Sequence, residues 1–245
     1  MKKKLWLKLL IVFTALAVCG GVLAVLLWNG VIQLNNPSRN KYPVRGVDVS
    51  RYQGKIDWQV LASQGIDFAF IKATEGSSHK DICFDYNYEE ARKTKLYAGA
   101  YHFFSFDSAG ETQAENFINT VEGYDDMLPP VIDVEYYKSK NTPTRENLSK
   151  ELKSMLDILE NHYNKKPIIY TTEDFYEKFF SEDYKEYDIW IRDVVAKPKL
   201  SDGKKWTFWQ YTNRETLGGY NGEEKYIDMN VFNGSRQDFV EYVNK

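Results

Sequence analysis

The sequence predicts an α/β fold, an irregular TIM-like (β/α) barrel preceded by one N-terminal transmembrane helix. Short apolar segments typical of strands alternate with amphipathic segments typical of helices, which indicates a mainly parallel sheet. About five such β/α units come first, and loops separate most of the last three strand segments, so we expect the barrel to lack helices in its final third. Residues 9–28 carry no charged side chain.

This uncharged segment is the first element. As a helix, its 20 residues would span about 30 Å, the thickness of a bilayer core. Trp6 and Trp28 flank it, and the lysines of residues 1–8 favour a cytoplasmic N-terminus. The segment therefore predicts a single-pass membrane protein with its domain outside the cell. A cleaved signal peptide is the alternative, although the apolar stretch is long for one and lacks a small-x-small cleavage site.

A linker and one domain account for the rest of the chain. Residues 29–43 contain Asn, Pro and Gly and predict a short polar linker, and residues 44–245 suffice for one large domain. Residues 42–245 hold 26 basic and 35 acidic side chains, and this net charge of −9 argues against binding nucleic acid. Of the two cysteines, Cys19 and Cys83, only the second lies in the domain, which excludes an intradomain disulfide.

The domain elements follow in chain order. Strands are expected at 44–50, 67–73, 96–104, 131–136 and 167–171, and the helices that follow them at 58–65, 84–95, 109–122, 144–162 and 175–180. Asp57 offers an N-cap for the first of these helices, and Leu148, Leu152, Leu156 and Leu159 mark one apolar face of the fourth. Strands at 188–192, 206–212 and 226–229 and a helix at 236–243 complete the prediction.

Two acids stand in the apolar strand 131–136. Residues two apart on a strand point to the same face, so we expect the carboxyl groups of Asp133 and Glu135 to project together. Two like charges there disfavour ionisation of both and raise one pKa, as the proton donor in glycoside hydrolysis requires. A structural pair neutralised by Lys or Arg is the alternative.

Polar side chains also fall near the ends of other strands. Asp48 falls near the end of the first strand, Tyr101 lies toward the end of the third, Gln210 and Tyr211 end the penultimate one, and Asp228 lies in the last. Since the carboxyl ends of barrel strands meet at one mouth, these residues should converge with the acid pair. The sequence has neither a phosphate-binding glycine loop nor metal-ligand spacing, so we expect no cofactor and no metal.

Seven ordered segments carry a further signal. They are GVDVSRYQGKIDW at 46–58, FAFIKATEG at 68–76, GAYHF at 99–103, VIDVE at 131–135, IIYT at 168–171, WTFWQY at 206–211 and DMNVF at 228–232. Together they resemble the motifs of the family 25 glycoside hydrolases, which are muramidases, over nearly the whole domain. The resemblance implies an irregular α/β barrel that cleaves the β-1,4 bond between N-acetylmuramic acid and N-acetylglucosamine in peptidoglycan. One departure is WIRDV at 190–194, where the family often has Trp-Ile-Ala and a turn that contains tyrosine.

The resemblance also implies roles for individual residues. Glu135 would be the general acid and Asp133 its anionic partner, and Asp48 and Asp228 would complete the acidic floor. The implied substrate-binding residues are Tyr101, Tyr170, Trp209, Gln210 and Tyr211. Whether Asp133 would act as a nucleophile, as a base for water or by orienting the acetamido group of the substrate stays open at this point.

These predictions imply three partners: the glycan strands of peptidoglycan, the membrane and a cell-envelope assembly served by local wall opening. The alternative function is a membrane-tethered, non-catalytic glycan-binding module. A freely diffusing phage endolysin is disfavoured because a membrane anchor would hold it back.

Overall fold

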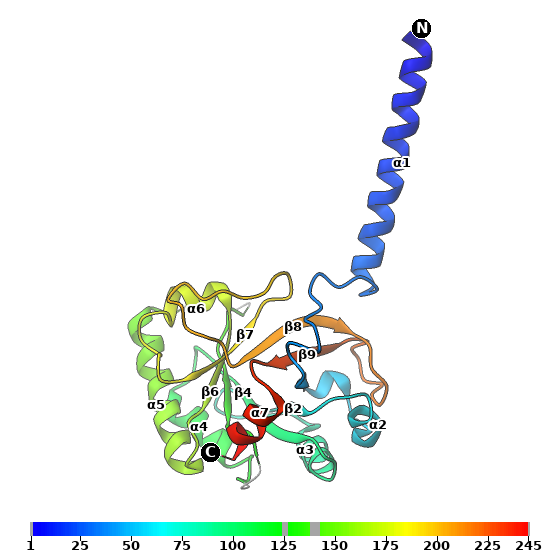
Figure 1. The fold of residues 1–245 in the computed structure, drawn as a ribbon. Helices are drawn as coiled ribbons and strands as arrows, with labels where there is room; N and C mark the ends of the chain where they lie inside the picture. The colour runs from blue at the N-terminus through cyan, green and yellow to red at the C-terminus, as the bar shows by residue number, and fades with distance from the viewer. Residues whose placement is uncertain (1, 124–126, 138–142, 245) are drawn as a thin grey trace.

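The computed structural model describes residues 2–123, 127–137 and 143–244. Its main features are a barrel and a long helix, α1 (Lys2–Trp28), that projects away from it (Figure 1). The strands are β1 (Arg45–Val49), β2 (Phe68–Glu75), β3 (His79–Lys80), β4 (Tyr97–Phe103), β5 (Val131–Asp133), β6 (Ile168–Thr172), β7 (Asp188–Arg192), β8 (Phe208–Glu215) and β9 (Ile227–Phe232). The domain helices are η1 (Arg51–Gln53, a 3-10 helix), α2 (Trp58–Ala62), α3 (Phe84–Arg92), α4 (Gly110–Ile118), α5 (Arg145–Tyr163), α6 (Glu173–Phe179) and α7 (Arg236–Val243).

The barrel closes through its first and last strands. Within the described residues the strand order is β1-β9-β8-β7-β6-β5-β4-β2-β3, and β2 also pairs with β1, which leaves β3 as an edge extension. Neighbours from β1 through β2 and β4 to β8 are parallel, whereas β9 is antiparallel to both β8 and β1. Because β9 follows β8 through a loop without a helical crossover, the two strands must run in opposite directions. The predicted irregular barrel with few helices in its final third is confirmed.

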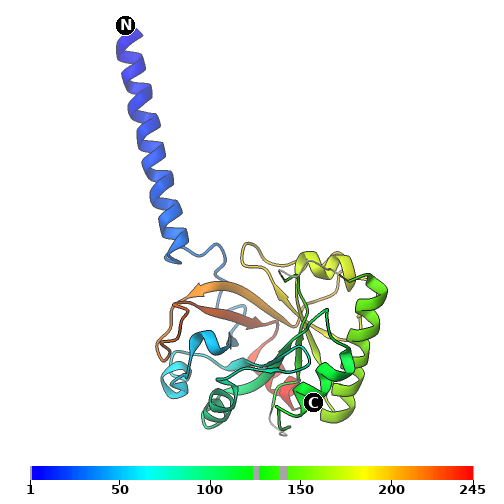
Figure 2. The same cartoon turned by 180° about the vertical axis from the view of Figure 1, so that it is seen from behind.

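Large aromatic side chains fill the inside of the barrel. Phe70 on β2 stacks on Trp190 of β7 with ring centroids 4.6 Å apart, and Phe68 lies 5.2 Å from Phe208 of β8. Gly46 on β1 makes room for this plug, since a Cβ atom there would lie 2.3 Å from the Phe68 ring. A second apolar layer lies between the strands and the outer helices. Figure 2 shows these helices around the strands. A filled interior leaves the ends of the strands as the place for a site.

The strand that carries the acid pair is shorter than predicted. β5 ends at Asp133, the last residue in register with β4, so Glu135 lies in the segment that follows the strand. Val134 still donates its backbone N–H to the carbonyl of Tyr170 on β6 at 2.9 Å, which keeps this segment extended. The two-residue strand β3 and the three-residue helix η1 were not predicted, because elements this short show no periodicity.

The predicted linker is in part packed onto the barrel. Tyr42 is buried, with its ring centroid 5.7 Å from that of Trp206 and 6.2 Å from that of Trp209, and the guanidinium of Arg45 donates to the carbonyl of Pro37. The preceding helix is long and apolar enough from Lys4 to Trp28 to cross a membrane, and its apolar window is not buried in the protein. A membrane anchor and a signal sequence share these properties.

Candidate active site

A polar cavity of about 250 Å³ opens at the carboxyl ends of the parallel strands. The residues that line it are Asp48, Val49, Ser50, Tyr52, Gln53, Lys72, Tyr101, Phe103, Asp133, Glu135, Tyr170, Trp190, Gln210, Glu224 and Asp228. Seven of the nine residues singled out in the sequence are therefore brought together: the four acids, Tyr101, Tyr170 and Gln210. The strand ends meet here because the barrel closes between β1 and β9, where Asp48 faces Asp228 in register.

Trp209 and Tyr211 lie elsewhere, which corrects the expectation for these two. Gln210 points into the barrel, and successive residues of a strand alternate between faces, so its neighbours point outward. Both rings are buried in the outer apolar layer, where the Trp209 indole N–H donates to the carbonyl of Asp193 at 2.8 Å and the Arg45 guanidinium lies 5.2 Å from the Tyr211 ring centroid. Their role in the described structure is to pack residues 42–45 and the loop after β7 onto the barrel.

A hydrogen-bonded chain fixes the floor of the cavity. Tyr170 donates its hydroxyl to Oε1 of Gln210 at 3.1 Å, which leaves the Gln210 amide nitrogen to donate to Asp48 at 2.9 Å and to Asp228 at 3.2 Å. The Asn230 amide nitrogen donates to Asp48 Oδ2 at 2.8 Å, and the Trp190 indole N–H in turn donates to Asn230 at 2.8 Å. Every polar atom of both amides is thus directed by a neighbour, which gives a rigid floor.

The carboxyl groups of Asp48 and Asp228 lie together in the floor, and each affects the pKa of the other. Burial raises the pKa of Asp48, and the hydrogen bonds from Asn230 and Gln210 oppose that rise by stabilising the anion. Burial and the charge of Asp48 hold the pKa of Asp228 well above its usual range, with the Arg192 guanidinium acting in the other direction. Of the two carboxyl groups, Asp48 is therefore the one that ionises first, and Asp228 keeps its proton to higher pH.

The predicted acid pair has raised pKa values in both members. Burial and then the charge of Glu135 hold the pKa of Asp133 well above its usual range. Burial also raises the pKa of Glu135, although Arg192 and Lys72 oppose the rise. Among the described residues no side chain or backbone group bonds to Oδ1 of Asp133, which is buried. A buried carboxylate oxygen without a partner is available to a donor on a ligand.

Other side chains of the wall were missed by sequence reasoning. Asn230 and Trp190 belong to the floor, and Gln53, which also lines the cavity, donates to Glu224 at 3.2 Å. Lys72, which sequence reasoning pairs with Glu75, lines the cavity as well and lies 2.7 Å from that carboxylate. Asn230 follows Asp228 by two residues, so strand alternation could have placed it on the same face. Nothing local in the sequence marks Gln53, in η1, or Glu224, in the loop before β9, as partners, because they lie far apart in the chain.

Burial also affects the phenols and the histidine near the cavity. It holds the pKa of Tyr101 and of Tyr170 well above the usual value, so both hydroxyls stay protonated. His102 points away from the cavity between Thr74 and Gln113, and burial lowers its pKa to about 4. In the part of the chain that the structure describes, His, Cys, Asp and Glu side chains form no group suited to a metal ion.

Comparisons with known proteins identify the family to which the chain belongs. Residues 47–220 match the model of the glycosyl hydrolases family 25. The structure of a family 25 glycosyl hydrolase from Bacillus anthracis superposes with a TM-score of 0.81 and 54% identity, covering 86% of this chain and 97% of that one. A bacterial lysozyme from Streptomyces coelicolor superposes with a TM-score of 0.75 and 31% identity over 82% of this chain and 97% of that one.

A relative found by sequence agrees with these structures. Lysozyme M1 of Streptomyces globisporus is 31% identical over 214 residues, which are 82% of this chain and 71% of the relative. The family model spans more than half of the chain, and the ordered motifs fall on the strands that build the cavity. This chain therefore belongs to family 25 of the glycosyl hydrolases.

Proposed function

We propose that this protein is a muramidase, which hydrolyses the β-1,4 bond between N-acetylmuramic acid and N-acetylglucosamine in peptidoglycan. The observation that carries the proposal is the pair Asp133 and Glu135, both with raised pKa values, in an acidic cavity of a family 25 chain. Relatives named as lysozymes support the same substrate class.

Glu135 is proposed as the general acid. It lies beyond the end of β5, nearer to solvent than Asp133, where a glycosidic oxygen can approach. Burial raises its pKa, so a larger fraction of Glu135 holds a proton near neutral pH than an exposed glutamate would. Protonation of the leaving oxygen breaks the glycosidic bond and leaves positive charge on the sugar ring, as in other glycosidases.

Asp133 is proposed to orient the acetamido group of the substrate. The raised pKa of Asp133 lets this carboxyl keep its proton to higher pH than an exposed aspartate would. An acetamido N–H that donates to the unpaired Oδ1 would stabilise the carboxylate form of Asp133 and so lower the pKa of Asp133. Since Asp133 and Glu135 titrate as a pair, the proton would then reside on Glu135. The acetamido oxygen would then attack the anomeric carbon. Of the three possible roles of Asp133, we propose this one because it gives the buried Oδ1 atom a hydrogen-bond donor.

Digestion of purified peptidoglycan by the full-length protein in detergent tests the activity. Mass spectrometry of the products after borohydride reduction should show newly reduced muramic acid ends. Newly reduced glucosamine ends would instead identify a glucosaminidase and overturn the proposed bond specificity. If the protein stays bound to the wall and releases no fragments, it is a glycan-binding module and not an enzyme.

A chemically modified substrate tests the role of Asp133. Peptidoglycan whose muramic acid lacks its N-acetyl group has no acetamido nucleophile, so we expect its cleavage to be lost, while unmodified wall is cleaved with retention of anomeric configuration. Retained cleavage of the modified wall would point to Asp133 as the nucleophile. Inversion of configuration would point to a base that activates water.

We further propose that α1 anchors the protein in the bacterial cell membrane, with the N-terminus in the cytoplasm and the barrel outside. The uncharged helix and the lysines before it support this orientation. An anchored enzyme would cut wall close to the membrane, for example beside a cell-envelope assembly that needs a local opening. A chain cut at Gly30 should leave the membrane fraction; if it stays there, α1 is not the anchor.

A further inference from the structure

The end of α1 is held directly by the barrel. The Arg214 side chain on β8 donates to the carbonyl of Trp28, and its guanidinium lies 5.1 Å from the Trp28 ring centroid. Gly30, with a φ of +68°, contacts the backbone of Arg214 so closely that a Cβ atom would lie 2.6 Å from its carbonyl oxygen. Gln33 then donates to Glu215 at 3.0 Å. The chain therefore docks on β8 as soon as the helix ends.

The next residues dock on the loop that follows β7. The Asn35 amide nitrogen, which is buried, donates to the carbonyls of Asp193 and Ala196 at 3.2 and 3.3 Å. Asp193 shapes this loop itself, because its Oδ1 accepts the backbone N–H groups of Val195 and Ala196 at 2.8 and 2.9 Å. Contacts to β8 and to the loop after β7 fix the position of the barrel relative to the end of α1.

These segments expose apolar side chains next to the end of the helix. Val31 is 69% exposed, Leu34 63% and Val195 63%. Beside them, a cavity of about 400 Å³ lies between α1, the docked segment and β8, and Leu27, Ile32 and Val194 are among its lining residues. Single exposed apolar residues are ordinary, but a group that continues the apolar surface of a helix is typical of an interaction site.

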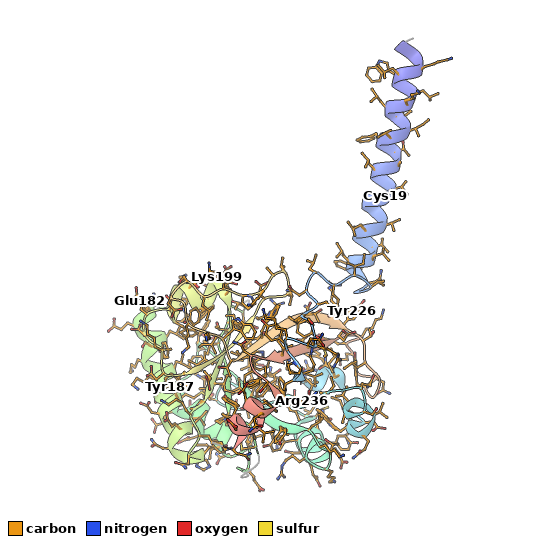
Figure 3. The ribbon with its side chains drawn as sticks, viewed as in Figure 1. Cys19, Glu182, Tyr187, Lys199, Tyr226 and Arg236 are labelled. Carbon is orange, nitrogen blue, oxygen red and sulfur yellow. The ribbon has the colours of Figure 1, made fainter. Side chains whose placement is uncertain are left out.

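The charge around this surface differs from that of the whole domain. Residues 42–245 have a net charge of −9, yet residues 193–205 hold four lysines and two aspartates. Lys197 and Lys199 are exposed, and Figure 3 places Lys199 on the edge of the domain that faces the same way as α1. Basic side chains beside exposed apolar ones suit the headgroup region of an anionic bilayer.

We propose that the surface formed by residues 31–34 and 194–199 rests in the headgroup region of an anionic lipid bilayer and holds the barrel in one orientation. This inference rests on the proposed anchoring by α1. Residues 194–199 follow the end of β7 at Arg192, and Arg214, which bonds to Trp28, lies near the end of β8. The cavity opens at these same carboxyl ends of the strands. The cavity-bearing end of the barrel is therefore the end held near the membrane.

Depth-dependent quenching tests the proposal on the full-length protein in vesicles of phosphatidylglycerol and phosphatidylcholine. A fluorophore is attached at Val195→Cys in a chain with Cys19→Ser and Cys83→Ser, and lipids that carry a nitroxide on the headgroup act as quenchers. Val240→Cys on α7 is the matched control, since Val240 is also an exposed valine and α7 lies away from α1 in Figures 1 and 2. We expect quenching at 195 and none at 240.

The other outcomes separate the parts of the proposal. Equal quenching at both positions in vesicle-bound protein would overturn the docking surface while leaving the anchor intact. Protein that does not bind vesicles at all would overturn both, without bearing on the muramidase activity. The double variant Lys197→Glu, Lys199→Glu should lose at least half of the quenching at 195 in anionic vesicles only. Unchanged quenching would exclude the charge contribution.

Discussion

Gln210 donates one amide nitrogen to both carboxylate oxygens of Asp48, at 3.1 and 2.9 Å. The orientation of this amide is fixed from behind, because the Tyr170 hydroxyl donates to its oxygen. A side chain of β8 thereby holds Asp48 on β1, and the same amide nitrogen also donates to Asp228 on β9. The acidic floor depends on this amide for its geometry and for the ionisation of Asp48.

Gln210→Leu should therefore destabilise the protein. The change removes the donor to half-buried Asp48 and leaves the Tyr170 hydroxyl without its acceptor, so the free energy of unfolding should fall by roughly 1–3 kcal/mol. Urea denaturation measures the loss. Gln237→Leu, on the exposed face of α7, is the control and should change stability by less than about 0.5 kcal/mol. Equal effects of the two changes would contradict the role of this amide.

Glu135→Gln should remove most of the activity without unfolding the barrel. The amide keeps the shape of the side chain but has no proton for the leaving oxygen, and general acid catalysis contributes on the order of 10²–10⁴ in rate. The rate of reducing-end release from peptidoglycan measures this loss, and circular dichroism checks the fold. Glu186→Gln, at an exposed position before β7, should leave the rate unchanged. A Glu135→Gln enzyme with near-normal turnover would rule out the proposed acid.

Asp133→Asn should stabilise the protein more at pH 7 than at pH 4. Burial raises the pKa of Asp133 in the folded state, so the unfolded chain loses this proton first as the pH rises. The folded state then binds more protons, and stability falls as the pH increases above the ordinary pKa of 3.8. Asparagine has no such penalty. Thermal melts of both proteins across this range give the comparison, and a gain independent of pH would refute it.

Arg192→Ala should move the alkaline limb of the pH–rate profile to higher pH. The Arg192 guanidinium opposes the rise in the pKa of Glu135, so its removal lets that pKa increase and keeps the acid protonated at higher pH. Rates measured from pH 4 to 9 give the limb. Arg236→Ala, which breaks the 2.5 Å ion pair with Asp67, is the matched control and should leave the limb in place. A shift of the limb to lower pH would be evidence against the assignment.

His102 should make the barrel sensitive to acid. Its Nε2 donates to Gln113 and its Nδ1 accepts from Thr74, so the buried ring is neutral. Burial lowers its pKa from 6.5 to about 4, so the unfolded state binds the proton first and stability falls as the pH drops through this window, by about 3 kcal/mol at most.

The variant His102→Gln isolates this effect. It should be less stable at pH 7, since the network is disturbed, but its stability should change less between pH 6.5 and 4 than that of the parent protein. Chemical denaturation at several pH values supplies both slopes. The exposed His162→Gln should keep the parent slope. If His102→Gln also keeps it, another group controls the acid response.

Most of the barrel was predictable because each of its longer strands and helices has its own periodicity. The positions of the strand ends could therefore be predicted as well. This placed Asp48, Asp133, Gln210 and Asp228 in one cavity, where the structure has them. The face of a strand is harder to predict. The run at 206–211 is aromatic and apolar on both faces, so nothing local showed that Gln210 points inward and its aromatic neighbours outward.

Long-range contacts account for the other differences. Residues 29–43 have the composition of a linker, yet Asn35 bonds to a loop 158 residues away, a contact that no local pattern predicts. Asn230 and Trp190 likewise support Asp48 only because β7, β9 and β1 meet in the closed barrel. Local pattern sets the elements, and the polar partners across strands appear only with the tertiary fold.

The pairing of Asp48 with Asp228 sets when the protein can become active. The two acids stand on the first and last strands of the barrel, and the register that joins them exists only after β9 has inserted between β1 and β8. If the domain is exported from its α1 side onward, Asp228 reaches the outside after the other three acids, because it comes last in the chain. A truncated or half-exported chain would lack the pairing of Asp48 with Asp228 that forms the acidic floor. We therefore expect such a chain not to cleave the wall.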